Sequence, residues 1–481
     1  THECSSAASD VYKRQIDYGV ERKEEIRALY EETLSNRKEL LELAEAIHEL
    51  GAMLEKEAKG GSLIPLYPKV PELLQGFVEL NYDLEERPGF RVFESLLYNS
   101  KYYQEDTQTI SLQMVNSDTE RSFVLSTPRL NDEGIIHCDV PFKDDVIDQL
   151  FAMHRIPGSE DAVNQIAEKL QISEDQRALF DSFFTKEKPA EYVPYSGPGI
   201  RTRYFGHACV LVETSELSLL VDPVISYDGY EKDVHGYTVA DLPEVIDYVL
   251  ITHNHQDHVL LETLLQLRHK IDTIVVPSSS KGSLQDPSLK MMFKQIGFSK
   301  IIELDDMEKI DLPKCEITAL PFLGEHADLD VRSKACFHVN MHNRFKVMFL
   351  ADSKNIEPKI YEKVQEYIGT IDVLFLGMEC DGAPLSWLYG PLLREPITRE
   401  NDQSRRLSGS DCSEGMDLVR LFQPSHVFVY AMGLEPWLEF ISSIKYTDVS
   451  RPIVESDDLI RICTEEGIVS ERLFGEKTIE F

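Results

Sequence analysis

Three histidines and an aspartate stand within six positions of the segment "ITHNHQDH", at residues 251–258. The segment continues an apolar run, and residues two apart in an extended chain point the same way, so His253 and His255 can share one metal ion. Asp257 and His258 lie slightly further along and can reach a second ion. Imidazole and carboxylate ligands suit zinc, iron or manganese. The spacing therefore predicts a dinuclear metal site rather than core or loop histidines.

Three acidic residues close apolar, strand-like segments elsewhere in the chain. Asp222 ends "LSLLVD", Asp352 ends "FKVMFLAD" and Glu379 ends "IDVLFLGME". An unpaired buried carboxylate is costly, so each of them needs a partner, which for any single one could be a salt bridge or a helix cap. All three stand at C-terminal strand ends, as His253 does, and clefts of layered α/β proteins commonly open at that edge. This shared position favours one common site.

The elements that must position these residues begin near Gly199. From there apolar strand segments follow one another, with helical stretches such as 260–270 and 358–368 between them. Many strands with interspersed helices predict a layered α/β architecture with two sheets or one large mixed sheet. The expected strands lie in residues 201–214, 217–224, 245–253, 273–277, 316–322, 335–341, 345–352, 371–378 and 426–433.

The chain before residue 196 carries no chemical motif. Residues 1–15 are polar and without periodicity, and we expect a foreign or disordered extension there. In the helical segment 16–61, apolar residues recur at helical spacing through residues 18–58, and "KGG" ends the helix. This helix either packs on its own domain or pairs with another chain.

Residues 62–195 predict a smaller domain of mixed α+β type. A Pro- and Gly-rich linker at 188–199 separates it from the metal domain, residues 196–481. Its expected strands lie in 91–98, 109–115 and 122–127, and its expected helices in 144–154, 162–170 and 174–184.

The composition restricts the functional class. The formal net charge of -35 argues against a nucleic acid or an anionic membrane as partner, although an acidic surface also serves solubility. Neither a transmembrane run nor a signal peptide is recognisable. The eight cysteines are scattered and form no C-x-x-C pair, which favours reduced thiols in a cytoplasmic protein.

The metal motif belongs to a wider pattern. "THNHQDH", together with "YFGHACVLVET", "LLVDP" and "FLADS", resembles the metallo-β-lactamase superfamily over roughly residues 200–480. The resemblance implies an αββα sandwich with a dinuclear metal site at one edge. By this resemblance His253 and His255 bind metal one, Asp257 and His258 bind metal two, Asp352 bridges the two, and Asp222 orients the histidine loop.

Two positions depart from the hydrolases of that superfamily. Their third histidine on metal one follows a glycine, whereas Glu325 follows the glycine here, and His326 would replace it if the register is off by one. Their last histidine stands on a late strand, where "PSHVFVYAMG" has Ala431. His426 in that segment matches an earlier histidine that is structural in character.

The predicted ligand set has therefore lost two imidazoles and gained at least one carboxylate. Oxygen-rich ligation shifts the metal preference from zinc towards iron or manganese. Open positions on a carboxylate-bridged iron pair are what dioxygen activation requires. The expected ligands of metal one are His253, His255, Glu325 and Asp352, and those of metal two are Asp257, His258 and Asp352, with Glu379 available nearby.

A closer resemblance extends from about residue 62 to the end of the chain. "THNHQDH", "LGEHADL", "LADS" and "GMECDGAP" are similar to the di-iron non-haem β-hydroxylases of the kind that acts in chloramphenicol biosynthesis. The resemblance implies two iron ions with Glu325 in place of the third histidine, and dioxygen as co-substrate. It also implies an amino acid tethered to a carrier protein of a nonribosomal peptide synthetase, and a homodimer formed by the N-terminal domain. No redox-cofactor motif is visible, so an external electron-transfer partner is expected.

Residues 380–412 read as a long functional loop. Trp387 and Tyr389 could line a pocket there. Arg405 and Arg406 could contact a phosphate or carboxylate, such as a carrier's phosphopantetheine arm, but ordinary surface charges are the favoured interpretation of the two arginines.

Two other functions are consistent with the same residues. A dinuclear zinc or manganese hydrolase would attack an ester, thioester, lactone or phosphodiester, and would need neither oxygen nor a reductant. A metal-binding scaffold without catalysis is the remaining alternative, and the full set of ligand candidates disfavours it.

Overall fold

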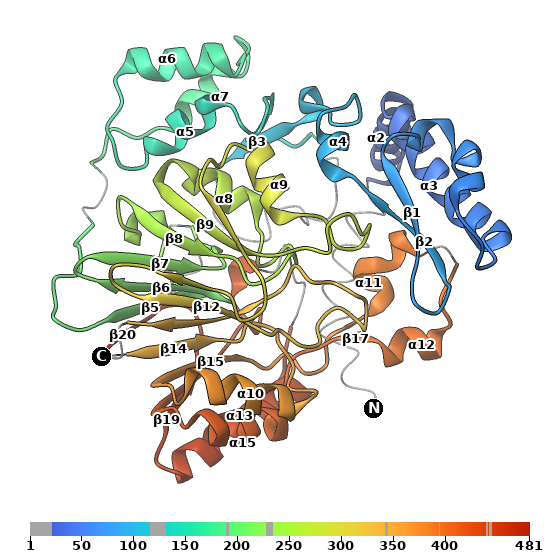
Figure 1. The fold of residues 1–481 in the computed structure, drawn as a ribbon. Helices are drawn as coiled ribbons and strands as arrows, with labels where there is room; N and C mark the ends of the chain where they lie inside the picture. Colours follow the sequence, from blue (N-terminus) through green and yellow to red (C-terminus); the bar gives the residue numbers. More distant parts are fainter. Residues whose placement is uncertain are drawn as a thin grey trace.

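The computed structural model describes residues 22–115, 131–188, 192–227, 234–341, 345–393, 395–438, 441 and 445–481. The C-terminal part contains two seven-stranded mixed sheets that stack face to face, with helices on both outer sides (Figure 1). The αββα sandwich predicted from the sequence is confirmed.

The first sheet is parallel on one side and antiparallel on the other. From β10 to β7 neighbouring strands run parallel, and from β7 to β20 they run antiparallel. Helices α8 (Leu261–Leu267) and α9 (Leu289–Gln295) cover its outer face. The strand order is β10 (Ile301–Leu304), β9 (Ile271–Pro277), β8 (Ile246–Leu250), β7 (Leu217–Val221), β6 (Cys209–Thr214), β5 (Arg201–Gly206) and β20 (Lys477–Glu480).

The second sheet has the same division. Strands β11 to β14 are antiparallel, and β14, β15, β18 and β19 are parallel. Its outer face is covered by α10 (Pro358–Ile368), α13 (Cys412–Phe422) and α15 (Arg451–Glu465). The strand order is β11 (Lys309–Asp311), β12 (Glu316–Leu320), β13 (Cys336–Asn340), β14 (Lys346–Phe349), β15 (Val373–Gly377), β18 (His426–Tyr430) and β19 (Val469–Arg472).

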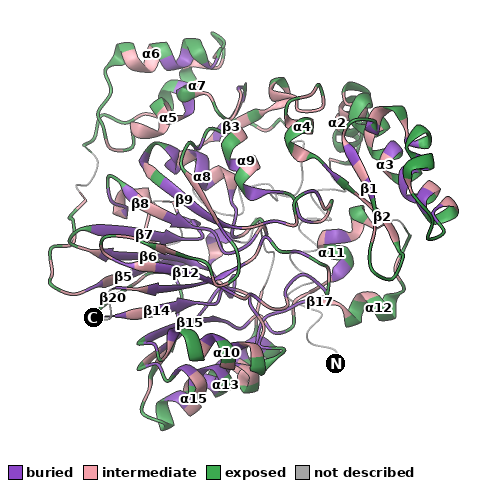
Figure 2. Cartoon of the chain, viewed as in Figure 1, coloured by how far each residue is buried: buried purple, intermediate pink, exposed green. Residues whose placement is uncertain are grey.

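The core has three layers, which follow from strands buried on both faces (Figure 2). Residues such as Val210, Phe337 and Phe375 fill the space between the sheets. Further apolar clusters fill the space between each sheet and its helices. Strands buried on both faces read as continuous apolar runs, which is why the nine expected segments contain ten of the strands. The segment 201–214, expected as one strand, is divided by a turn into β5 and β6. The edge strands β10, β11, β19 and β20 have only three or four residues each and were missed.

The N-terminal residues make two packing units. Apolar side chains of α3 (Lys38–Glu57) and of the hairpin β1–β2 (Val78–Tyr82 and Pro88–Val92) form their own cluster. Side chains from residues 109–113 and 135–184 instead share the apolar cluster on the outer face of the first sheet. These residues form β3 (Thr109–Gln113), β4 (Ile135–Asp139), α5 (Asp145–Ala152), α6 (Glu160–Lys169) and α7 (Arg177–Ser182). The proposed domain boundary near residue 195 stays a prediction.

Two local predictions need correction, and two others lie outside the described residues. The single helix expected over 18–58 is divided at Arg37 into α2 (Lys23–Asn36) and α3, because α2 has no buried residue to hold it in line with α3. The strand expected at 91–98 ends at Val92, and α4 (Glu94–Tyr98) follows, since Phe93, Leu96 and Leu97 have helical spacing. The expected extension at 1–15 and strand at 122–127 lie outside the described residues.

The expected loop at 380–412 is also more ordered than predicted. It contains the two-stranded pair β16 (Ala383–Pro384) and β17 (Arg406–Leu407). Helices α11 (Leu385–Tyr389) and α12 (Arg399–Ser404) lie between these strands. Leu385, Tyr389 and Leu407 form a small apolar cluster with Ala327, so the segment has a core of its own.

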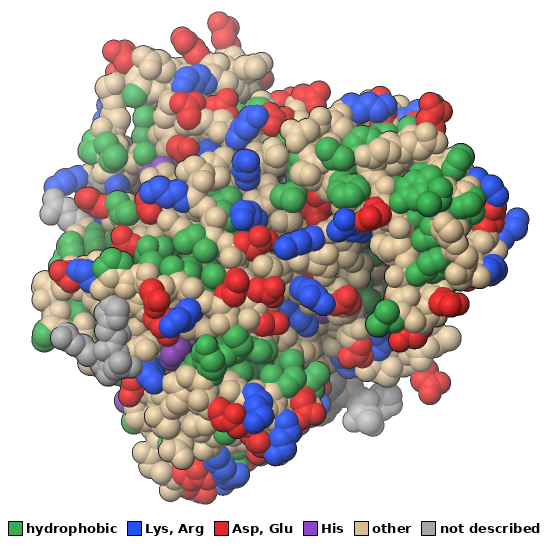
Figure 3. Space-filling model, in the orientation of Figure 1, with side chains coloured by type: hydrophobic (Ala, Val, Ile, Leu, Met, Phe, Trp, Pro, Cys, Tyr) green, Lys and Arg blue, Asp and Glu red, His purple; other side chains and the backbone are tan. Residues whose placement is uncertain are grey.

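The surface carries both signs of charge. Acidic side chains are interspersed with Lys and Arg over the face drawn in Figure 3. Among the residues described, no helix combines the length and apolar character that crossing a bilayer requires.

Gly377, at the end of β15, offers a test of how closely the second sheet is packed beneath the site. A Cβ at this position would lie 2.1 Å from the Ala351 carbonyl oxygen, which accepts a hydrogen bond from the Gly377 N–H at 3.0 Å. We expect Gly377→Ala to reduce the free energy of unfolding by about 1–3 kcal/mol, measured by urea denaturation.

Gly61→Ala is the matched control, because a Cβ there meets no atom within 4 Å. Its stability should stay within about 0.5 kcal/mol of the wild type. Equal unfolding midpoints for the two variants would show that β15 can move away from Ala351 at little cost.

Candidate metal centre

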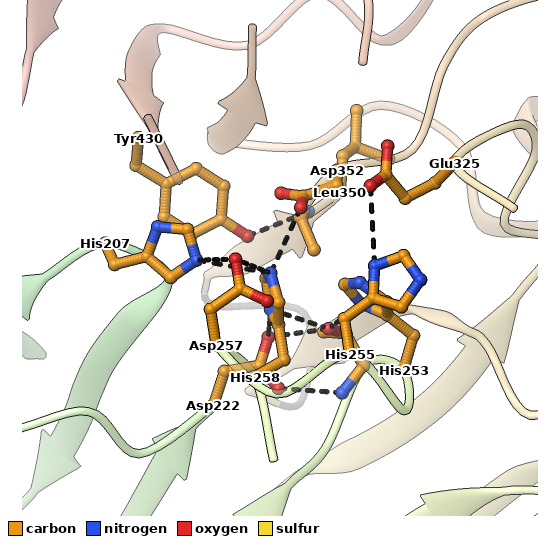
Figure 4. A network of polar contacts seen from close by, with 12 residues as sticks. His207, Asp222, His253, His255, Asp257, His258, Glu325, Leu350, Asp352 and Tyr430 are labelled. Carbon is orange, nitrogen blue, oxygen red and sulfur yellow. Dashed lines mark hydrogen bonds and ion pairs between the residues drawn. The ribbon is translucent and has the colours of Figure 1, made fainter. Parts of the chain in front are cut away.

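The predicted ligands meet at one edge of the sandwich. His253, Asp257 and His258 follow β8 of the first sheet, and Asp352 follows β14 of the second. The parallel strands of both sheets bring their carboxyl ends to this edge. Figure 4 shows these side chains, with His255 and Glu325, pointing into a common space from the two sheets.

The described residues provide two groups of three ligand atoms, each within 4.8 Å of one another. One group consists of His253, His258 and Asp352, and the other of His207, Asp257 and His258. His258 Nε2 lies 3.1 Å from Asp352 Oδ2 and connects the two groups. The arrangement is that of two adjacent metal positions.

Two buried atoms at the first position point to a missing partner. His253 Nε2 and Asp352 Oδ1 have no hydrogen-bond partner among the described residues. The His253 ring is held from behind, since its Nδ1 lies 3.0 Å from the hydroxyl of Thr252. A buried imidazole nitrogen and a carboxylate oxygen without partners fit a metal ion.

Glu325, rather than His326, lies beside the histidine pair. Its Oε1 is 3.4 Å from His255 Nδ1, and its left-handed backbone (φ 61°) follows a glycine. The neighbouring His326 points its Nδ1 at the hydroxyl of Tyr389, 2.6 Å away. Glu325 therefore occupies the place at which the superfamily's third histidine was expected, and its role as a ligand stays a prediction.

Asp222 contacts the histidine loop from behind. Its fully buried carboxylate accepts hydrogen bonds from the Thr252 N–H (2.8 Å) and hydroxyl (2.6 Å), and its Oδ2 lies 2.8 Å from His258 Nδ1. With Nδ1 held in this way, His258 Nε2 is left free to face the centre of the site.

Asp352 is held through its backbone neighbour. The N–H of Ala351 donates to the hydroxyl of Tyr430 on β18 at 2.9 Å, and Ala351 adopts a left-handed conformation (φ 46°). Figure 4 shows the Tyr430 ring beside the Asp352 backbone. A neighbouring strand thus fixes the turn that presents the carboxylate.

His207 was missed as a site residue. It lies in the turn between β5 and β6, and its Nε2 is 3.3 Å from both Asp257 Oδ2 and His258 Nε2. Its carbonyl accepts a hydrogen bond at 2.9 Å from the N–H of Ala431, the position where the superfamily's last histidine was expected. The quoted motif "YFGHACVLVET" contained the only signal for it. His426 bonds to the hydroxyl of Ser425 through Nδ1.

Burial and neighbouring groups lower the pKa values of His253 and His255 and raise the pKa of Glu325. Burial first, and then neighbouring histidines, lower the pKa of His253. Burial likewise lowers the pKa of His255 to about 4. Burial and the nearby Asp352 and Asp257 charges raise the pKa of Glu325. Neutral imidazole is the form that binds a metal, and bound cations would offset the crowding of carboxylates.

Glu379 belongs to neither group and has other hydrogen-bond partners in this structure. Its Oε1 accepts a hydrogen bond from the Tyr446 hydroxyl at 3.2 Å, and its Oε2 accepts one from the Gly382 N–H. Burial raises the pKa of Glu379 to about 7. Its predicted role at metal two therefore requires the carboxylate to change partners.

A cleft of about 330 Å³ opens next to Glu325. Lys354, Arg406 and Arg451 line it together with Asp381. Two of these cations have carboxylate partners: Lys354 lies 3.8 Å from Glu414, and Arg451 lies 3.7 Å from Asp381. The cleft is thus polar, with charges of both signs.

The four residues predicted to bind substrate have different surroundings. Arg406 donates to the carbonyls of Asp381 and Gly382, and Arg405 donates to that of Ala327, so both brace the backbone. The Trp387 side chain is 43% exposed and Tyr389 is buried. Substrate binding by these four stays a prediction.

Comparison with known proteins decides the family. Residues 13–189 match the family described as the di-iron non-haem β-hydroxylase N-terminal domain, and residues 218–383 match the β-lactamase superfamily domain. Over 95% of its length the chain is 40% identical to the 4-amino-L-phenylalanyl-[CmlP-peptidyl-carrier-protein] 3-hydroxylase of Streptomyces venezuelae, covering 86% of that protein. The chain belongs to the di-iron β-hydroxylases.

The solved structures agree with this membership of the di-iron β-hydroxylases. The crystal structure of CmlA, a di-iron β-hydroxylase from Streptomyces venezuelae, superposes with a TM-score of 0.87 at 38% identity, over 96% of this chain and 86% of that one. A metal-dependent hydrolase of Rhizobium johnstonii is 33% identical to this chain over a short segment. That segment makes up 12% of this chain and 24% of the hydrolase. The chain is thus a di-iron enzyme by family, and its buried, partnerless ligand atoms fit that cofactor.

Asp222→Asn tests how the histidine loop is supported. The amide can donate where His258 Nδ1 requires an acceptor, so the ring orientation should loosen. We expect iron to bind about 10- to 100-fold more weakly, measured by titration of the metal-free protein. Asp311→Asn, at an exposed strand end, should bind iron like the wild type. Unchanged affinity in Asp222→Asn would show that Thr252 alone fixes the loop.

Proposed function

We propose that this protein hydroxylates the β-carbon of an amino acid that is held as a thioester on a peptidyl carrier protein. The supporting observation is 40% identity over 95% of the chain to a hydroxylase that acts on carrier-bound 4-amino-L-phenylalanine at carbon 3. The proposed substrate class is therefore an aromatic aminoacyl group on the carrier of a nonribosomal peptide synthetase.

The donor atoms of the site support an iron pair. We assign His253, His255 and Glu325 to one ion and Asp257 and His258 to the other, with Asp352 between them. When bound, the two irons supply the activation of dioxygen and the oxidation of an unactivated carbon. The protein's part is to keep His253 and His255 neutral by burial, to hold the histidine loop through Thr252 and Asp222, and to keep bulk water away from the buried ligands.

Glu379 is proposed to bind the second iron in one state and leave it in another. In the described state its two oxygens accept from Tyr446 and Gly382. A carboxylate with alternative donors close by can leave an ion without becoming an unpaired buried charge. Its departure would free a coordination position on the side where Asp257 and His258 lie.

The cleft beside Glu325 is the proposed route of the aminoacyl group. It is polar, and its arginine Arg406 is held rigidly by backbone carbonyls. Such walls suit the amides of a pantetheine arm better than a phenyl ring. We therefore assign the arm to the cleft and the amino acid to the space nearer the ligands.

Further partners follow from the reaction. Dioxygen hydroxylation returns one oxygen atom as water and consumes two electrons, so an external electron donor is required. The N-terminal domain is proposed to form a homodimer. The seven cysteines of the described residues are free, and six of them are buried, which is consistent with a reducing cytoplasm.

The first experiment is metal analysis of protein purified without added metal. It is followed by anaerobic reduction, exposure to oxygen and incubation with carrier protein loaded with 4-aminophenylalanine or phenylalanine. The expected result is about two irons per chain, an oxygen-dependent change in the visible spectrum, and a carrier-bound product heavier by one oxygen atom. Two zinc ions with no response to oxygen would contradict the proposal and direct attention to ester, thioester and phosphodiester hydrolysis.

Glu379→Gln tests the proposed carboxylate movement. The amide retains the shape but binds iron weakly and loses the charge. We expect hydroxylation of the carrier-bound substrate to fall about 10- to 100-fold, measured by mass spectrometry of the carrier. Glu366→Gln, on the exposed face of α10, is the control and should keep full activity. Wild-type turnover in Glu379→Gln would remove Glu379 from the mechanism.

A further inference from the structure

The two nitrogens of His255 face different partners. Nδ1 lies 3.4 Å from Glu325 Oε1, and Nε2 lies 3.4 Å from the hydroxyl of Tyr389. The ring is buried, so neither nitrogen has bulk water as an alternative. If Glu325 and His255 share an ion, as the proposed function requires, Nδ1 is the ligand atom and Nε2 carries the proton.

The Tyr389 hydroxyl stands between two histidines. Besides its contact with His255, it lies 2.6 Å from Nδ1 of His326. A phenol donates one hydrogen bond and accepts others, and a neutral imidazole has one N–H and one lone pair. With the His255 Nε2–H donating to the phenol oxygen, the phenol hydrogen must be donated to His326 Nδ1. In this direction the His255 N–H and the phenol O–H each meet an acceptor, and the second proton of the neutral His326 ring lies on Nε2, which has no hydrogen-bond partner among the described residues.

We propose that Tyr389 is a positioning residue for the iron centre: its hydroxyl fixes the tautomer and ring orientation of His255, and His326 fixes the hydroxyl. Metal-bound histidines generally donate their second ring N–H to a fixed acceptor, and loss of that acceptor weakens metal binding. The inference rests on the proposed assignment of Glu325 and His255 to one iron.

The surroundings of Tyr389 are built for such a role. It is the last residue of α11, and it packs with Leu385, Leu407 and Ala327 in a buried apolar cluster. Helix α11 is tied at its other end, because the Ser386 N–H and hydroxyl donate to Asp402 at 2.8 Å each. A phenol on a helix fixed at both ends has little freedom to turn away from His255.

The same contact explains His326. This histidine follows the glutamate that occupies the expected ligand position, and its ring packs edge-on against that of His255, with centroids 4.5 Å apart. Its Nδ1 is used by the phenol and is unavailable to an ion. The histidine next to the ligand position thus supports the site from outside.

Tyr389→Phe is the direct test, because it removes the hydroxyl and keeps the ring in the apolar cluster. We expect one of the two irons to bind about 10- to 100-fold more weakly in anaerobic titrations with ferrous iron. The near-infrared ligand-field bands of that iron should shift as well. Tyr102→Phe is the control, since its hydroxyl donates to the Leu73 carbonyl in the N-terminal part, and it should bind both irons normally.

Two substitutions of His326 provide a second test that leaves Tyr389 intact. His326→Leu removes the acceptor and should reproduce the weaker iron binding. His326→Asn places an amide oxygen near the former Nδ1 and should restore at least part of the affinity. Metal-free stability is measured in parallel by thermal unfolding, and we expect the variants to resemble the wild type there.

The proposal is overturned if Tyr389→Phe binds both irons with wild-type affinity and an unaltered spectrum. If His326→Leu binds iron normally while Tyr389→Phe does not, the role of Tyr389 stands and the proposed role of His326 is wrong. These readouts are independent of turnover. Failure of the iron-loaded wild type to hydroxylate any aminoacyl carrier would reject the proposed function and leave the iron-binding comparison valid.

Discussion

The stability of the site depends on how several buried carboxylates are compensated where they lie close together, at the edge of the sandwich to which both sheets contribute. Asp222 and Glu325 are buried beside Asp352 and Asp257, and few water molecules can screen them. Removing charges from water costs several kcal/mol each unless partners compensate. Asp222 takes its compensation from Thr252 and His258. Asp352 Oδ1 has no hydrogen-bond partner among the described residues, and cations between the inward-facing carboxylates would compensate their charges.

This constraint accounts for the layer of residues behind the ligands. A neutral imidazole directs its lone pair inward when its other nitrogen has a fixed acceptor outside. Asp222 is that acceptor for His258. The phenol oxygen of Tyr389 has the matching position behind His255. One support comes from the end of a strand in the first sheet and the other from the segment between β15 and β18 of the second sheet, so the site depends on both halves of the sandwich.

The sequence predicted what spacing and local pattern determine. The histidine loop after β8 and the acids after β7 and β14 were recognisable because buried strands read as apolar runs and end at the same edge. The departure from the hydrolase pattern also pointed to Glu325, which lies beside His255 and whose role as a ligand stays a prediction. The remaining residues depend on tertiary packing: His207 lies in a tight turn of another hairpin, and Tyr446 is 67 positions from Glu379. No periodicity connects such pairs before the chain is folded.

In the predicted ligand set carboxylates replace imidazoles, and the segment 380–412 limits the flexibility that this replacement introduces at the metal site. A site that has lost two histidines holds its metals with flexible, charged ligands, which favour iron and allow open positions. Flexibility near the ions has to be confined to the ligand that must move. Arg406 braces the backbone of Asp381 and Gly382, and Gly382 in turn holds Glu379. The same segment carries Tyr389 to His255. It thereby fixes one side of the centre, and it also supplies Gly382, one of the two hydrogen-bond partners of Glu379, the carboxylate that is proposed to move.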